Sequence, residues 1–130
     1  MKSIMKLLLV DDNDRIRKMM RSIYSPHFDE VIECDDGESA VLAFDGNNPD
    51  WVVMDINLPT GKAGMKEMDG IEATEKIITA HPGAKVIIVS QYNDETTIDA
   101  AKRAGAVEFI SKENLSNVIE FINNHLRSAQ

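Results

Sequence analysis

The chain has 130 residues, which is enough for one domain with a substantial core, and its 43% hydrophobic and 28% charged residues are ordinary for a globular protein. Its formal net charge of -8 disfavours direct binding to nucleic acid, because excess carboxylate repels the phosphate backbone. Apolar runs such as Leu7–Val10 are far shorter than the roughly 20 residues that span a membrane.

The N-terminal residues and the cysteine count both favour a cytoplasmic protein. No apolar stretch of secretory-signal length follows Met1–Lys6. Cys34 is the sole cysteine, so an internal disulfide is excluded, as is usual in a reducing compartment. We therefore expect a cytoplasmic protein with no membrane contact.

Short apolar runs alternate with helical segments along the chain. The runs are apolar on both faces, which is typical of strands buried in a parallel sheet, and between them apolar residues recur with helical spacing. In chain order the sequence predicts a strand at 7–10, a helix at 14–24, a strand at 31–34, a helix at 38–44, a strand at 51–54, a helix at 70–80, a strand at 86–89, a helix at 94–104, a strand at 107–110 and a final helix that carries the apolar residues from 115 to 126.

Several element ends and core faces can also be predicted. Asn13 or Asp14 can cap the first helix, Ser25-Pro26 ends it, and Gly105 suits the position just past the helix at 94–104. The first and last helices are predicted to turn an apolar stripe toward the core, formed by Ile16, Met19, Met20 and Ile23 in the first and by Leu115, Val118, Ile119, Ile122 and Leu126 in the last.

Five strand–helix units predict an α/β fold. Apolar strands joined by right-handed helical crossovers give a doubly wound, five-stranded parallel sheet with helices on both faces. We expect a single domain over residues 1–130. In such folds, ligands bind beyond the carboxyl ends of the strands, so the residues at those ends are the candidate site.

Polar side chains follow four of these strands. Asp11 and Asp12 end the first strand, Asp55 ends the third, Ser90 ends the fourth, and Lys112 follows the fifth. Three converging carboxylates repel one another, and a hard divalent cation such as Mg²⁺ or Mn²⁺ offsets that repulsion. A carboxylate beside a metal and an ammonium group can attack phosphorus to form an acyl phosphate. The strand ends therefore predict a metal-dependent phosphoryl-transfer site.

The sequence resembles the receiver domains of two-component response regulators from about Ile4 to Leu126. The resemblance implies the flavodoxin-like (βα)5 receiver fold. It is carried by the stretches LLLVDDN at 7–13, VMDINLP at 53–59, MDGIEA at 68–73, VIIVS at 86–90, AGA at 104–106 and ISK at 110–112.

The resemblance implies a role for each metal and phosphoryl residue. Asp55 would be the phosphoacceptor and would also bind Mg²⁺. Asp12 would bind the metal directly, Asp11 would bind it through water, and Asn57 would contribute its backbone carbonyl. Lys112 would bind the phosphoryl group.

The resemblance also implies a switch and partners. A sensor histidine kinase would phosphorylate Asp55, and Ser90 and Phe109 would then reshape the face formed by the helix at 94–104, the strand at 107–110 and the last helix. The alternative for Phe109 is a plain core residue. That face would bind an output domain, a downstream protein or a second copy in a phosphorylation-dependent homodimer. Such a protein is a signalling module and not an enzyme acting on an external substrate.

The connection after Asp55 departs from the family pattern. Gly70 lies fifteen positions after Asp55, where the family motif takes eight, so a seven-residue insertion is predicted within 60–67. Two interpretations stand. The insertion is a surface loop, since added length costs little entropy, or it is a flap that overhangs the active site and modulates phosphoryl access, or docks a partner.

Two other functional classes stay open. In a haloacid dehalogenase-type Mg²⁺-dependent phosphatase, Asp12-Asn13-Asp14 would carry the nucleophile, but Arg15 follows where that family has Thr or Val. In a phosphorylation-independent receiver-like binding module, Gln91 and Glu113 would reflect a modified site, because they replace the small residue and the proline that many receivers have there.

Overall fold

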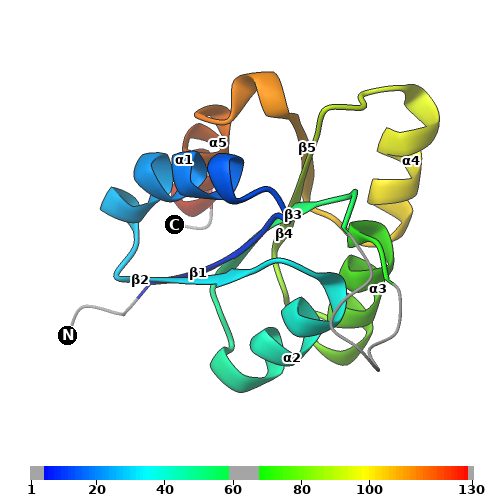
Figure 1. The fold of residues 1–130 in the computed structure, drawn as a ribbon, viewed down its shortest axis with the longest axis horizontal. Helices are drawn as coiled ribbons and strands as arrows, with labels where there is room; N and C mark the ends of the chain where they lie inside the picture. Colours follow the sequence, from blue (N-terminus) through cyan, green and yellow to red (C-terminus); the bar gives the residue numbers. More distant parts are fainter. Residues whose placement is uncertain (1–4, 59–67, 129–130) are drawn as a thin grey trace.

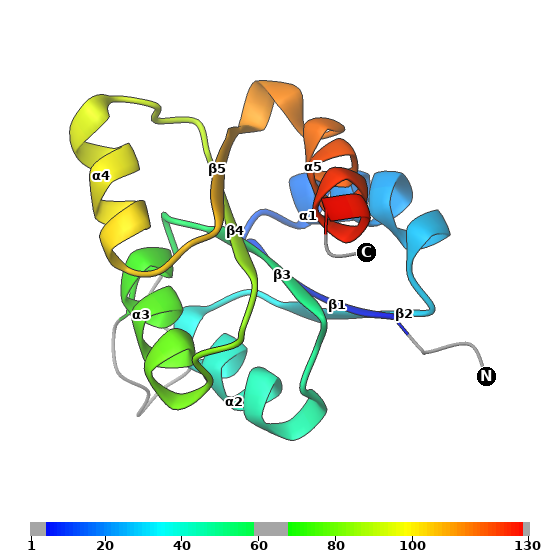
Figure 2. The same ribbon diagram turned by 180° about the vertical axis from the view of Figure 1, so that it is seen from behind.

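The computed structural model describes residues 5–58 and 68–128, in which strands and helices alternate (Figures 1 and 2). The strands are β1 (Lys6–Val10), β2 (Glu30–Cys34), β3 (Trp51–Asp55), β4 (Val86–Ser90) and β5 (Glu108–Ser111). The helices are α1 (Asp14–Tyr24), α2 (Gly37–Asn47), α3 (Gly70–Ala80), α4 (Glu95–Arg103) and α5 (Asn117–Ser128), with short 3-10 turns at Ser25–His27 and Lys112–Asn114.

The strands form one parallel sheet in the order β2-β1-β3-β4-β5. This confirms the predicted doubly wound parallel sheet. The chain moves from β1 outward to β2 and then crosses back to β3, so the strand order reverses between β1 and β3. Ligands of doubly wound sheets bind at such a reversal, beyond the carboxyl ends of the strands.

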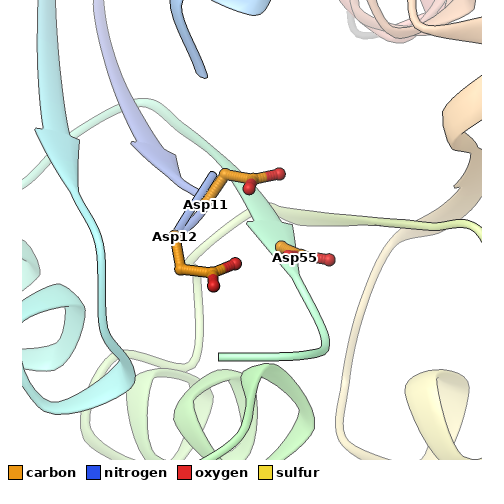
Figure 3. A group of neighbouring side chains, drawn as sticks. All are labelled: Asp11, Asp12 and Asp55. Carbon is orange, nitrogen blue, oxygen red and sulfur yellow. The ribbon is translucent and has the colours of Figure 1, made fainter. Parts of the chain in front are cut away.

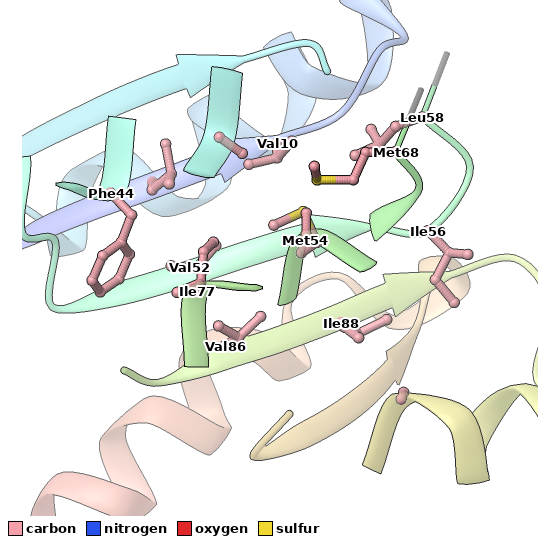
Figure 4. Packing of buried hydrophobic residues seen from close by; sticks show 14 residues of the cluster. Val10, Phe44, Val52, Met54, Ile56, Leu58, Met68, Ile77, Val86 and Ile88 are labelled. Atoms are coloured by element: carbon pink, nitrogen blue, oxygen red, sulfur yellow. The ribbon is translucent and has the colours of Figure 1, made fainter. Parts of the chain in front are cut away.

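Helices cover both faces of the sheet. Helices α1 and α5 lie on one face, and α2, α3 and α4 lie on the other (Figures 1 and 2). Alternate side chains of each strand enter opposite layers. In β1, Leu8 and Val10 pack with Val52 and Met54 of β3 under α2 and α3 (Figure 4), while Leu7 and Leu9 pack under α1 and α5. This two-sided burial explains why the central strands are continuously apolar.

The predicted start of α1 and the predicted end of α4 are confirmed. Asn13 caps α1, and its side chain accepts a hydrogen bond from the backbone N–H of Ile16. After α4, Gly105 has φ 104°, a left-handed conformation that glycine adopts without strain. The backbone N–H groups of Gly105 and Ala106 then donate to the carbonyls of Lys102 and Ala101, which closes the helix as a Schellman motif.

Three sequence predictions are wrong in detail. Met19 is 49% exposed, because the inward face of α1 runs through Met20 and Tyr24 and leaves Met19 at its flank. Leu126 is 41% exposed, because the last buried position of α5 is Ile122 and the final turns extend beyond the core. Helix α2 continues to Asn47, three residues further than predicted, and ends where Asn48 adopts a left-handed conformation.

The described helices are short. The longest, α5, has 12 residues, and among residues 5–58 and 68–128 no helix combines the length and apolar character that a bilayer crossing requires.

Candidate functional site

Three carboxylates meet at the reversal point of the sheet. Asp11 and Asp12 directly follow β1, and Asp55 is the last residue of the neighbouring β3 (Figure 3). One oxygen of each side chain lies within 4.8 Å of the others. Asp11 and Asp55 are buried, whereas Asp12 is exposed. The predicted convergence of these three residues is confirmed.

Asp11 is held by contacts on both of its carboxylate oxygens. Oδ1 accepts a hydrogen bond of 2.9 Å from the backbone N–H of Asn13, which directs the chain into α1. Oδ2 is buried without a hydrogen bond in the described chain, and its ion-pair partner is the Lys112 ammonium at 3.1 Å. A buried carboxylate oxygen with so few partners is suited to a further cationic ligand.

Lys112 bridges the two buried acids. It begins the 3-10 turn after β5, and its Nζ atom lies 3.1 Å from Asp11 Oδ2 and 3.1 Å from Asp55 Oδ1. Burial lowers the pKa of the Lys112 ammonium, but the carboxylates of Asp55 and Asp11 outweigh burial and raise this pKa above its ordinary value. Lys112 is therefore a fixed positive charge at the floor of the site.

The Asp55 carboxyl is harder to ionise than an ordinary aspartate. Burial raises its pKa to about 6, the nearby Asp11 carboxylate adds to the increase, and Lys112 opposes it. Burial and the Asp11 carboxylate together therefore outweigh the single Lys112 ammonium group at Asp55. The three carboxylates fit a hard divalent cation, which prefers oxygen ligands and would supply the missing positive charge.

The acids open onto a surface depression of about 530 Å³. Asp12, Asp55, Asn57 and Lys112 line it, as expected for residues that would surround a metal and a phosphoryl group. Gln91, the residue after β4, lines it as well, so the residue that replaces the family's small side chain lies at the opening of the site. Arg15 also lines this depression, and the sequence analysis did not identify it as a site residue. One feature of the sequence could have indicated it: Arg15 is a cation in the first turn of a helix, where acidic residues are favoured.

Ser90 and Phe109 occupy positions behind this opening. Ser90 is buried at the end of β4, and its Oγ accepts a hydrogen bond of 3.0 Å from the backbone N–H of Tyr92. Phe109 is partly buried in β5 and packs against the core layer under α2, α3 and α4. Within the described chain, neither residue lines the depression over Asp55.

The long connection after β3 returns to the strand end that it leaves. The backbone N–H groups of Leu58 and Gly70 both donate to the Ile56 carbonyl, at 3.0 and 2.8 Å. Asp69 then caps α3 by accepting from the backbone N–H of Glu72. A Cβ atom on Gly70 would lie 1.8 Å from the carbonyl oxygen of Asp55, so only glycine fits there. The predicted insertion within 60–67 lies outside the described residues.

Comparisons with known proteins identify the family of this chain. The sequence profile of the response regulator receiver domain matches residues 7–123. Chemotaxis protein CheY of Listeria monocytogenes is 37% identical over 110 residues, which cover 84% of this chain and 87% of that protein. The transcriptional regulatory protein DegU of Brevibacillus brevis is 32% identical over 110 residues, which cover 83% of this chain but 44% of DegU, so the chain spans less than half of that relative.

Solved structures show the same fold. The CheY-like response regulator receiver domain protein from Methanospirillum hungatei JF-1 has a TM-score of 0.83 at 26% identity, covering 97% of this chain and 96% of that one. A chain of the CheX-CheY-BeF3-Mg complex from Borrelia burgdorferi has a TM-score of 0.78 at 26% identity, covering 94% and 89%. The matched family profile, the parallel sheet and the acidic cluster at its reversal point together place this chain among the response regulator receiver domains of two-component systems.

Proposed function

We propose that this chain is a phosphorylation-dependent signalling receiver in which Asp55 accepts a phosphoryl group from a sensor histidine kinase. One observation carries the proposal: Asp55 ends β3 as a buried carboxylate, 3.1 Å from the Lys112 ammonium and beside two further acids, at the floor of an open depression. A buried acid beside a fixed cation can act as a nucleophile when a dianionic phosphoryl group approaches.

The phosphoryl transfer follows from the placement of these groups. A carboxylate oxygen of Asp55 attacks phosphorus, the bond from phosphorus to the donor breaks, and the bonding electron pair leaves with the donor. Lys112 lies between Asp11 and Asp55 and would hold a transferred phosphoryl oxygen. Asp11, Asp12, Asp55 and the Asn57 carbonyl would hold Mg²⁺ or Mn²⁺, which supplies positive charge against the developing negative charge.

Ser90 and Phe109 are the proposed switch residues. The Ser90 hydroxyl accepts the Tyr92 N–H, so its own proton is available to a phosphoryl oxygen on the neighbouring strand end. A shift of Ser90 would pull the loop before α4, and Phe109, which is partly buried in β5, would repack. The altered α4-β5-α5 face would then bind an output domain, a downstream protein or a second copy.

The relatives support these partners. DegU is named a transcriptional regulatory protein, and the Borrelia burgdorferi CheY was crystallised with CheX, BeF3 and Mg²⁺. We propose that this chain likewise transmits a kinase signal through a protein partner, in the cytoplasm and without turnover of an external substrate. We also propose that residues 1–130 form a single receiver domain, with a loop insertion within 60–67.

Acetyl phosphate tests the proposal. With Mg²⁺ and acetyl phosphate, we expect the wild type to gain one phosphoryl mass by intact-protein mass spectrometry, and Asp55→Asn to gain none. A chelator should abolish the wild-type modification. Steady release of phosphate that survives Asp55→Asn would favour the phosphatase alternative, and a wild type that stays unmodified would favour the phosphorylation-independent binding module.

A further inference from the structure

Arg15 occupies an unusual position for a cation. It is the second residue of α1, after the cap Asn13 and the first residue Asp14. The positive end of the helix dipole lies there and disfavours a guanidinium group. At an exposed position this cost is small, and an ion pair with an anion would offset it.

No residue of the described chain supplies that interaction to Arg15. Arg17, two residues further along α1, does have such partners. It forms ion pairs with Asp14 at 2.6 Å and Glu33 at 3.0 Å, and it donates a hydrogen bond to the Asp11 carbonyl at 2.7 Å. Within 5–58 and 68–128, Arg15 makes neither an ion pair nor a side-chain hydrogen bond, and it is exposed. As far as the described residues go, its charge is therefore unpaired and can interact with a bound molecule.

Arg15 faces the same depression as Asp55 and Lys112. Lys112, with a side chain 16% exposed, lies at the floor and is paired with the two buried acids. Arg15 is exposed and lies at the rim, and the two residues are the cations among the described residues that line the depression. A donor that places its phosphoryl group at the floor must extend its leaving group toward the rim.

We infer that Arg15 binds the carboxylate leaving group of an acyl phosphate and so selects acyl phosphates as small-molecule donors. This inference rests on the proposed phosphorylation of Asp55. A planar guanidinium group matches a carboxylate with two parallel hydrogen bonds, whereas the ammonia that leaves phosphoramidate offers no such partner. In the reaction with acetyl phosphate, the Asp55 carboxylate forms a bond to phosphorus, the bond between phosphorus and the acetyl oxygen breaks, and acetate leaves with the electron pair beside Arg15.

Acetyl phosphate and phosphoramidate deliver the same phosphoryl group but have different leaving groups. A comparison of the two donors therefore separates recognition of the leaving group from a general effect on the site. We would measure rate constants for modification of Arg15→Gln, Arg15→Lys and the wild type with acetyl phosphate and with phosphoramidate, at fixed Mg²⁺ and ionic strength. Lys18→Gln is the matched control, because Lys18 is exposed on the same helix and does not line the depression. Circular dichroism would establish that each variant is folded.

For Arg15→Gln we expect about a fivefold loss of the second-order rate constant with acetyl phosphate and a change below about twofold with phosphoramidate. Arg15→Lys should recover part of the loss, and Lys18→Gln should react like the wild type with both donors. An equal loss with both donors, or no loss with acetyl phosphate, would overturn the role of Arg15 while leaving Asp55 as the acceptor. A wild type that neither donor modifies would overturn the proposed function and this inference together.

Discussion

Gly70→Ala is expected to lower the free energy of unfolding by roughly 3 kcal/mol, at the upper end of the cost of overpacking. An added Cβ would lie 1.8 Å from the Asp55 carbonyl oxygen and 2.9 Å from the Ile56 Cα atom. Both contacts are with backbone, so no side chain can rotate away. The Gly70 N–H also donates to the Ile56 carbonyl at 2.8 Å, so a shift that relieved the clash would break this hydrogen bond.

Urea denaturation measures this cost. The matched control is Gly46→Ala, because Gly46 lies in α2 and an added Cβ there meets nothing within 4 Å. Alanine at an open helix position should be neutral or stabilising by up to about 1 kcal/mol. A Gly70→Ala protein within 1 kcal/mol of the wild type would show that the end of β3 is less tightly packed than described. Displacement of Asp55 should also slow its phosphorylation.

Asp55→Asn is expected to stabilise the metal-free protein near pH 7.5 by about 2 to 3 kcal/mol. The pKa of Asp55 rises from 3.8 to about 6 on folding, with burial as the main cause. Below pH 3.8 the group is protonated in both states and imposes no penalty. As the pH rises from 4 to 6, the unfolded chain releases its proton first, so the wild type loses stability until the folded group also ionises. Asparagine removes this loss.

The measurement is thermal or urea unfolding in the presence of a chelator, at a series of pH values from 4.5 to 8. The stability difference between Asp55→Asn and the wild type should grow as the pH rises and level off above pH 6 to 7. Asp99→Asn, an exposed position in α4, is the control and should show no such trend. Saturating Mg²⁺ should stabilise the wild type more than Asp55→Asn. A variant that is less stable than the wild type near pH 7.5 would contradict the electrostatic account of Asp55.

Most of the architecture could be predicted from the sequence because its local signals agree with one another. Runs such as Leu7–Val10 are apolar on both faces since helices cover both sides of the sheet. In a parallel sheet the carboxyl ends of the strands share one edge, so the sequence alone predicts that Asp11, Asp55 and Lys112 lie close together, as their 3.1 Å contacts confirm.

Two burial predictions are wrong because helical periodicity alone does not define the limits of the buried face of a helix. Met19 and Leu126 fit an apolar stripe, yet Met19 lies at the flank of the inward face of α1, and Leu126 lies beyond Ile122, the last buried position of α5. Arg15 was missed for another reason: the direction of a side chain at a loop–helix junction depends on how α1 docks, which periodicity does not encode. The role of residues 60–67 stays a prediction, although the chain after them is anchored at Gly70, which donates to the Ile56 carbonyl and packs against the backbone of Asp55.

Chemical mapping of the phosphorylated residue tests the central claim most directly. After reaction with acetyl phosphate and Mg²⁺, borohydride reduces an acyl phosphate on aspartate to homoserine, which peptide mass spectrometry locates. We predict homoserine at position 55 and unmodified aspartate at positions 11 and 12. Homoserine at position 12, as the phosphatase alternative requires, or at none of the three positions, would contradict the assignment of Asp55 as the phosphoacceptor.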